Sequence, residues 1–141
     1  MKVGFTGTQV GMSRAQRVWL EEYLRGAFPS TSPPDEFHHG DCVGADVEAH
    51  SLVRELTFPP LIVIHPPRNA SKRAFTFKQR NKGGTLQLPS KGYIERNHDI
   101  VDATDVLVAA PRTDKEEIRS GTWATVRYAL RLGRVVHIIP R

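Results

Sequence analysis

Short apolar runs alternate along the chain with longer stretches in which apolar residues recur at helical spacing. The runs are rich in β-branched residues and are bounded by glycine, proline or charged residues, a pattern typical of buried strands. Pro66 directly follows one of these runs and ends it. The pattern predicts five strands, which lie at Lys2–Thr6, Phe37–His39, Leu61–His65, Asp105–Ala110 and Val135–Ile139.

The stretches between these runs predict amphipathic helices, because their apolar residues recur every three or four positions. The first helix follows Ser13, which can form a capping box with Gln16, and it ends before Pro29. Gly133 is well placed to cap the last helix at its C-terminal end. The remaining helices are predicted at about 45–56, 93–103 and 121–132.

Strands joined by helices favour a parallel sheet with right-handed crossovers. We therefore predict an α/β fold, a single Rossmann-like domain over residues 1–141 with an open, mainly parallel five-stranded sheet flanked by helices. A length of 141 residues suits one hydrophobic core. In such sheets ligands bind beyond the carboxyl ends of the strands, where the strand order reverses.

One segment, 66–92, departs from this alternation. It has no clear period and contains Gly83-Gly84 and Pro89. A loop this long inside a compact domain is usually either a functional lid or disordered, and its composition does not decide between the two. We refer to residues 66–92 as the basic insertion, since its lysines and arginines carry much of the formal net charge of +5.

Composition narrows the class of protein. Contents of 39% hydrophobic and 25% charged residues are those of a globular domain. No apolar run approaches the roughly 20 residues of a bilayer-spanning helix, and the N-terminus does not resemble a signal peptide. The single cysteine, Cys42, excludes an internal disulfide. These features favour a cytoplasmic protein without a membrane partner.

Three glycine-containing loops stand at the predicted carboxyl ends of strands or before a helix. They are Gly7-Thr8, the run from Gly40 to Asp46, and Ser120-Gly121-Thr122. Backbone N–H groups at the start of a helix are free and carry partial positive charge, so they suit phosphate. Neither a G-x-G-x-x-G fingerprint nor a P-loop occurs in the chain. The sequence thus predicts a nucleotide-sized site at one rim of the sheet.

Five motifs occur in a recognisable order and together resemble the SLOG superfamily. They are Gly4-Phe5-Thr6-Gly7-Thr8, His39-Gly40-Asp41-Cys42-Val43-Gly44-Ala45-Asp46, Arg96-Asn97, Asp105-Val106-Leu107-Val108-Ala109-Ala110-Pro111 and Gly121-Thr122. That group includes DprA-like DNA-binding proteins, LOG-type phosphoribohydrolases and many small bacterial and phage proteins. The resemblance covers nearly the whole chain except the basic insertion.

The resemblance implies a ligand site. Gly7 and Thr8 would lie under the ligand, and Ser120, Gly121 and Thr122 would receive a phosphate. Gly40, Gly44 and Asp46 would shape the second loop, and Asp41 in the same loop is a further candidate for ligand binding. Arg96 matches a functional arginine of the LOG-type motif, and its fork of donors suits phosphate; the alternative is a surface arginine paired with Glu95 or Asp99. Asn97 can hydrogen-bond a sugar or a base.

The LOG-type enzymes follow their Gly-Thr with a catalytic glutamate, whereas Trp123 follows Gly121-Thr122 here. N-glycosidic cleavage needs a carboxylate. The candidates are Asp41, Asp46 and Asp99, with Glu116 or Glu117 if their loop folds inward. Asp46 has an alternative role as a helix cap, and we place that structural role first. The histidines show no metal-ligand spacing, so we expect neither a metal nor a cofactor.

Two functions remain open at this point. The first is a protein that binds a nucleotide or nucleotide-derived ligand, either as a sensor or as an N-glycosidic hydrolase. The second is a single-stranded nucleic-acid binding module of DprA-like type, in which the basic insertion contacts phosphates and Phe75 and Phe77 stack on bases. A solvated basic loop is an equally good account of the insertion. A homo-oligomer is compatible with either function.

Overall fold

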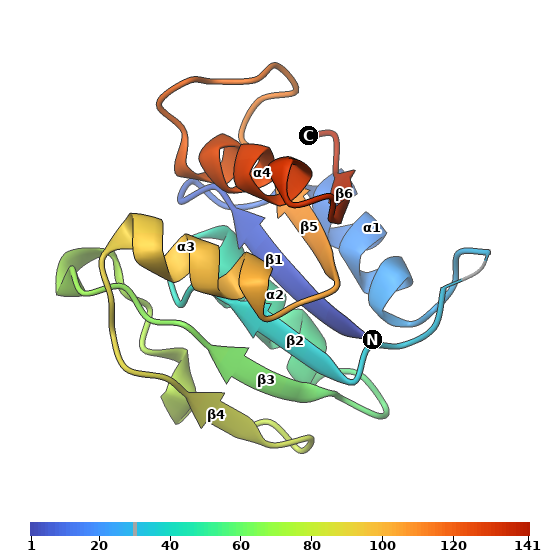
Figure 1. Ribbon diagram of the computed structural model, residues 1–141. Coiled ribbons are helices and arrows are strands. Elements are labelled where there is room, and N and C mark those ends of the chain that lie inside the picture. The colour runs from blue at the N-terminus through green and yellow to red at the C-terminus, as the bar shows by residue number, and fades with distance from the viewer. Residues whose placement is uncertain (30) are drawn as a thin grey trace.

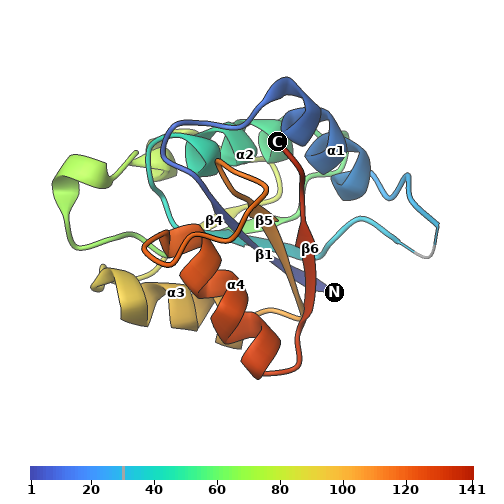
Figure 2. The same cartoon turned by 90° about the horizontal axis from the view of Figure 1, so that it is seen from above.

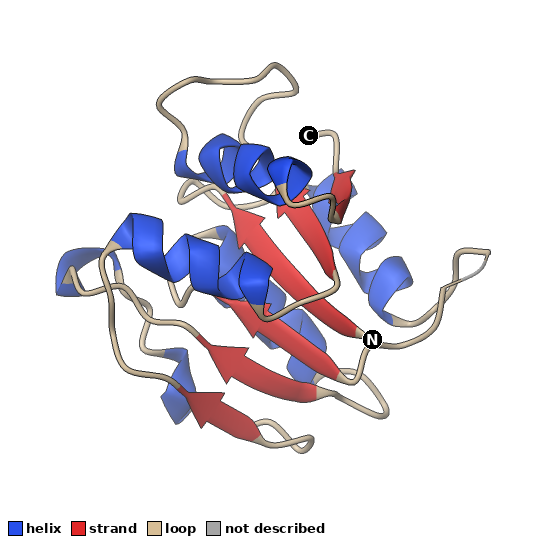
Figure 3. Ribbon diagram, in the orientation of Figure 1, coloured by secondary structure: helices blue, strands red, loops and turns tan. Residues whose placement is uncertain are grey.

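A computed structural model describes residues 1–29 and 31–141 and contains one parallel sheet covered by helices on both faces. The strands are β1 (Lys2–Gly7), β2 (Glu36–His39), β3 (Leu61–Ile64), β4 (Thr85–Gln87), β5 (Val106–Ala110) and β6 (Val135–Ile138). The helices are α1 (Arg14–Leu24), α2 (Ala45–Arg54), α3 (Tyr93–Asp102) and α4 (Gly121–Arg131). Helices and strands alternate through most of the chain, as the sequence predicts (Figure 3).

The strand order is β4-β3-β2-β1-β5-β6, and every neighbouring pair is parallel. The chain moves outward from β1 in one direction through β2, β3 and β4, and then returns to the other side of β1 with β5. The strand order therefore reverses between β1 and β5, where ligands bind in open α/β sheets. The predicted α/β class is confirmed, but the sheet has six strands instead of five.

Helices α1 and α2 cover one face of the sheet, and α3 and α4 cover the other (Figure 2). Buried Phe5 and Phe37 pack beneath α1 and α2, and Leu107 packs with Val126 on the α4 side. The capping box predicted at Ser13 is present, since Gln16 and Ser13 exchange hydrogen bonds. The amide of buried Gln16 also donates to the carbonyl of Pro111 at 2.9 Å, which ties α1 to the end of β5.

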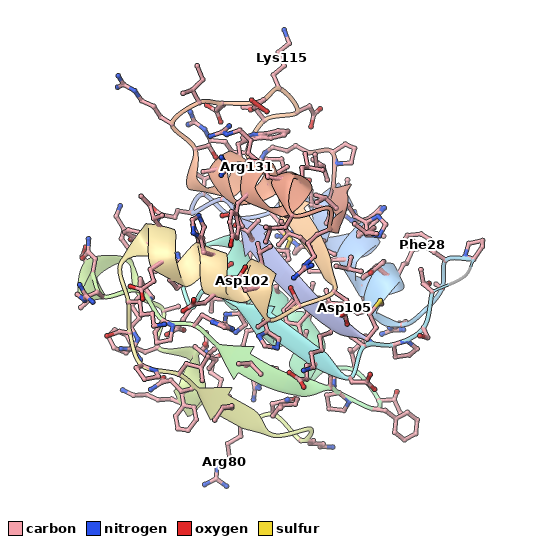
Figure 4. All side chains as sticks on the ribbon, viewed as in Figure 1. Phe28, Arg80, Asp102, Asp105, Lys115 and Arg131 are labelled. Carbon is pink, nitrogen blue, oxygen red and sulfur yellow. The ribbon has the colours of Figure 1, made fainter. Side chains whose placement is uncertain are left out.

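The sixth strand, β4, lies inside the basic insertion and pairs with β3 through Ile62 and Thr85. Its three residues have no apolar alternation, because it is a short edge strand that buries little of its surface. The insertion is neither a lid over the sheet rim nor without structure: it contains β4 and two single turns of 3₁₀ helix, at Ala70–Lys72 and Thr76–Lys78. Arg80, from this segment, points away from the body of the protein (Figure 4).

Candidate functional site

A cavity of about 840 Å³ opens at the carboxyl ends of β1 and β5, at the reversal of strand order. Its volume falls in the range of small-molecule sites. The walls come from the loops after β1, β2 and β5 and from the first turns of α3 and α4. Most residues predicted from the sequence line it: Gly7, Thr8, Gly40, Asp46, Arg96, Asn97, Ser120, Gly121 and Thr122.

One wall of the cavity is the start of α4. Ser120 is the N-cap, and its hydroxyl accepts the N–H of Trp123 at 3.3 Å. The N–H groups of Gly121 and Thr122 have no hydrogen-bond partner within residues 1–29 and 31–141. A Cβ added at Gly121 would meet nothing within 4 Å, so the space in front of this helix start is open. Two free donors and the positive end of α4 therefore face the cavity.

Arg96 forms the floor of the cavity on the α3 side and is only 5% exposed. Its Nη1 donates to the carbonyl oxygens of Gly40 and of His65, the latter at 3.2 Å, and its Nε donates to Oδ1 of Asn97 at 2.8 Å. The guanidinium passes directly over Gly40, where an added Cβ would lie only 2.8 Å from Cζ of Arg96. Only glycine leaves room for the arginine at this position. Arg96 is therefore a buried loop-bracing residue and pairs with neither Glu95 nor Asp99.

Asp46 lies in the first turn of α2 and is 5% exposed. Its Oδ2 accepts the N–H of Cys42 at 3.1 Å, four residues earlier in the loop. The helix-capping role expected for Asp46 is wrong, because Gly44 is the N-cap of α2 and no side chain of the described residues caps this helix. Oδ1 of Asp46 is buried without a partner in the described part of the chain, although the residue lines the cavity. Burial raises the pKa of this carboxyl to about 6, against the opposing attraction of the Arg96 guanidinium. Asp46 thus brings to the cavity wall a carboxylate with one buried, unpartnered oxygen.

Cys42 also lines the cavity, but it is not an activated thiol. Burial and the charge of Asp46 raise the pKa of its side chain to about 11, so it stays protonated at neutral pH. The Arg96 guanidinium lies 3.7 Å from its Sγ, yet burial outweighs that attraction. Cys42 fills a tight loop as a small residue.

Asp41 and Gly44 belong to the same loop but do not line the cavity. The fully buried carboxylate of Asp41 faces the basic insertion, where it accepts from the Thr76 N–H at 2.8 Å, the Thr76 hydroxyl at 2.6 Å and Nε of Arg73 at 3.0 Å. Gly44 has a φ of 91°, and a Cβ there would lie within 2.7 Å of Cα of Gln9. Both residues shape the loop from outside the cavity.

The other candidate carboxylates are already paired. Asp99 accepts from Nζ of Lys91 at 2.6 Å and lines a separate, smaller cavity. Glu116 and Glu117 do line the main cavity, because the loop between β5 and α4 rises beside it. Glu117 accepts two hydrogen bonds from Arg112, the shorter at 2.7 Å, and Glu116 lies 3.5 Å from Nη1 of Arg127. Lys115 marks the outer end of this loop in Figure 4.

Among the lining side chains that sequence reasoning missed, Tyr93 and Arg119 have the chemistry to contact a ligand. Tyr93 opens α3, and its ring centroid lies 5.4 Å from Cζ of Arg96. Arg119 is exposed and forms no ion pair within the described residues. Its position directly before the Ser120 cap was the available signal, because a cation beside a helix start strengthens an anion site.

The basic insertion is a separate surface. Phe75 and Phe77 are 43% and 49% exposed, and Cζ of Arg73 lies 4.6 Å from the centroid of the Phe75 ring. Arg73 is also bonded to Asp41, so part of the basic charge is already neutralised. Nucleic-acid binding by this surface stays a prediction.

Within residues 1–29 and 31–141, no cluster of three or more histidine, cysteine, aspartate or glutamate side chains has the arrangement of a metal site. No helix of this described part has both the length and the apolar character needed to cross a bilayer.

No family model and no curated protein matches the chain. Solved structures that are similar to it include the following two. A molybdenum cofactor binding protein from the phototrophic bacterium Rippkaea orientalis superimposes with a TM-score of 0.64 over 97% of this chain and 74% of its own, at 17% identity. A protein named TM1055 gives a TM-score of 0.59 over 96% of this chain and 71% of its own, at 19% identity. At these identities the likeness establishes a shared Rossmann-like α/β fold.

Proposed function

We propose that the protein binds a nucleotide or nucleotide-derived ligand in the main cavity, as a sensor of that ligand. The observation that carries the proposal is the helix start at the strand-order reversal, where the N–H groups of Gly121 and Thr122 are free and face a cavity of about 840 Å³. Such a start binds phosphate in many α/β proteins. One of the structural neighbours is itself a molybdenum cofactor binding protein.

The cavity walls suit the parts of a nucleotide. A phosphate fits between the start of α4 and the uncommitted cation of Arg119. The Oδ1 atom of Asp46 can accept a hydrogen bond from a sugar hydroxyl. That bond would give this buried oxygen the partner that it lacks in the protein alone. The Tyr93 ring offers a flat apolar surface to a base, and Asn97 offers an amide beside it.

We expect Gly121→Val to abolish binding of nucleoside monophosphates and to leave the fold intact. The valine side chain would enter the open space before α4, where the phosphate would lie, and its Cβ would meet no protein atom within 4 Å. A ligand at about 100 times its dissociation constant stabilises a protein by roughly 2.7 kcal/mol. A thermal-shift panel of nucleoside monophosphates and ADP-ribose derivatives on the wild-type protein and the variant measures this.

Gly92→Val is the matched control for that experiment. Gly92 caps α3, has equally open space around it and lines neither cavity. The control should keep the ligand-induced shift. A panel in which no compound stabilises the wild-type protein would contradict the proposed function. Gly44→Val is a poor probe, because its Cβ would overlap the backbone of Gln9 and displace the loop.

We expect Asp46→Asn to weaken nucleotide binding by about tenfold or more, since a lost hydrogen bond to a charged group costs roughly 1.5–3 kcal/mol. The asparagine oxygen can still accept the Cys42 N–H, so the loop is preserved while the free acceptor becomes a donor. Titration calorimetry gives the affinities. Glu95→Gln, on the exposed face of α3, is the control and should bind as the wild-type protein does.

The wild-type protein and the Asp46→Asn variant also distinguish a sensor from a hydrolase. Asp46 is the one aspartate of the three catalytic candidates that lines the main cavity. We expect no release of free base from nucleoside monophosphates above the rate in buffer, as measured by chromatography. Rapid release by the wild-type protein that Asp46→Asn abolishes would overturn the sensor function and make Asp46 the catalytic carboxylate.

A further inference from the structure

A second cavity, of about 230 Å³, lies between the end of β3 and α3. Buried Arg96 forms a wall shared with the main cavity, and the other polar walls are His65, Lys91 and Asp99. His65 is 3% exposed. None of these last three residues lines the main cavity, so the second cavity has its own chemistry.

A chain of hydrogen bonds leads from the start of β2 to this cavity. Oε1 of Glu36 lies 2.9 Å from Nε2 of His38, and Nδ1 of His38 lies 2.8 Å from Nε2 of His65. Glu36 and His38 are two residues apart on β2 and therefore share a face, and His65 directly follows the neighbouring strand β3. The side chain of Glu36 is 25% exposed, so the far end of the chain reaches solvent.

The partners settle where the protons lie. The Glu36 carboxylate only accepts, so Nε2 of His38 carries a hydrogen. In the neutral state Nδ1 of His38 then accepts from Nε2–H of His65. Nδ1 of His65 is consequently a bare lone pair, and among the described residues the ring makes only the hydrogen bond through Nε2. The second cavity thus holds the unpartnered nitrogen of a buried imidazole.

We propose that the second cavity binds a small oxyanion, of carboxylate or phosphate size, together with one proton. The proton adds to Nδ1 of His65, which becomes a donor to the anion. The Nε2 proton of His65 passes to Nδ1 of His38, whose positive charge the Glu36 carboxylate then balances. Atoms and charge are conserved: one proton and one anion enter, His38 becomes cationic and His65 stays neutral.

The charges around the cavity support this arrangement. The lining side chains Lys91, Arg96 and Asp99 sum to one positive charge, with Asp99 2.6 Å from Lys91. Glu95 lies outside the lining, 3.6 Å from Lys91, and its side chain is 62% exposed. Burial lowers the pKa of His38, and burial together with the neighbouring His38 lowers that of His65 to about 3, so no proton is held before the anion arrives. The charged and titratable groups facing this pair are Lys2, Glu36, His39, Lys91, Arg96 and Asp99.

The test follows the histidine nitrogens of the full chain by NMR. Inorganic phosphate and, separately, acetate are titrated at pH 6, 7 and 8 against sodium chloride of equal ionic strength. We expect Nδ1 of His65 to change from an unprotonated to a protonated nitrogen on saturation. The apparent affinity should rise by up to about tenfold for each unit that the pH falls, because one proton is bound with the anion. A His65 signal that neither anion moves at pH 6 overturns the proposal.

Two variants distinguish this site from the main cavity. Glu36→Gln removes the carboxylate that balances His38, so it should abolish the pH dependence of anion binding. Arg119→Ala alters the main cavity only, so it should weaken nucleotide binding and leave the response of His65 unchanged. A pH dependence that survives in Glu36→Gln overturns the proposal, even if nucleotide binding in the main cavity is confirmed. The two inferences therefore fail independently.

Discussion

Replacing Asp41 by alanine is expected to destabilise the protein by about 3–5 kcal/mol, the usual cost of breaking a buried ion pair. The carboxylate is fully buried and accepts three hydrogen bonds, from the Thr76 N–H, the Thr76 hydroxyl and Nε of Arg73. Alanine leaves the Thr76 donors buried without an acceptor and leaves Arg73, only 19% exposed, without its counter-charge. Urea unfolding followed by circular dichroism measures the loss.

The matched control for Asp41→Ala is Glu21→Ala. Glu21 also pairs with an arginine, Arg25 at 2.7 Å, but both side chains are exposed on α1. Its loss should cost no more than about 0.5 kcal/mol, as for other exposed helix pairs. Equal effects of the two substitutions would contradict the anchoring role of Asp41. We also expect Asp41→Ala to expose the basic insertion to limited proteolysis before the rest of the chain, because Asp41 is the buried anchor of this segment.

The sequence predicts the fold well where local pattern and tertiary structure agree. The runs Leu61–Ile64 and Val106–Ala110 are buried strands with continuous apolar residues, and the capping box at Ser13 forms as its residue types indicate. The strand β4 escapes prediction, because an edge strand of three residues is specified by its partner β3 and not by its own pattern. Strand number therefore depends on a tertiary contact.

The same contrast holds at the candidate site. Glycine loops at strand ends predict which segments converge, and Gly121 and Thr122 do line the main cavity. The direction of each side chain is set by packing instead. Asp41 lies in the loop after β2, and Asp46 lies five residues later in the first turn of α2. The side chain of Asp41 faces the basic insertion, whereas Asp46 lines the main cavity. The backbone of Asp41 has a φ of 55°, which is rare for a residue with a side chain, and this conformation directs the carboxylate away from the cavity. No sequence pattern predicts this conformation.

Acidification is expected to destabilise the protein steeply below pH 6.5, because histidines are buried uncharged. His39 and His50 are fully buried. Nδ1 of His39 accepts the Asp41 N–H at 3.0 Å, its Nε2–H donates to Nδ1 of His50 at 2.9 Å, and Nε2–H of His50 donates to the carbonyl of Gln79 at 3.1 Å. Every ring nitrogen of the pair is satisfied in the neutral form, so a further proton would replace a hydrogen bond by a repulsion.

The sign of the effect follows from the pKa shifts. Burial lowers the pKa of both histidines below the ordinary value of 6.5, so the unfolded chain binds more protons below that pH. The stability they contribute is complete above pH 6.5 and is lost as the pH falls. If a histidine stays uncharged in the folded protein from pH 7.5 to 5.5, the free energy of unfolding falls by about 1.4 kcal/mol over that range, because only the unfolded chain takes up the proton. The pair therefore lowers the stability by up to about 3 kcal/mol, and the pKa values of His38 and His65 shift in the same direction.

Asp46 acts in the opposite direction, because its pKa is raised to about 6 and the folded protein takes up its proton first. One carboxyl group offsets less than about 1 kcal/mol over this range, so the histidines dominate. Urea unfolding of the wild-type protein at pH 7.5, 6.5 and 5.5 should show the loss, and the double variant His39→Gln/His50→Gln should reduce it by up to about 3 kcal/mol. His137→Gln, on β6 and outside both histidine pairs, should change the pH dependence little. A double variant as acid-sensitive as the wild-type protein would show that the neutral imidazole pair is not the source of the pH dependence.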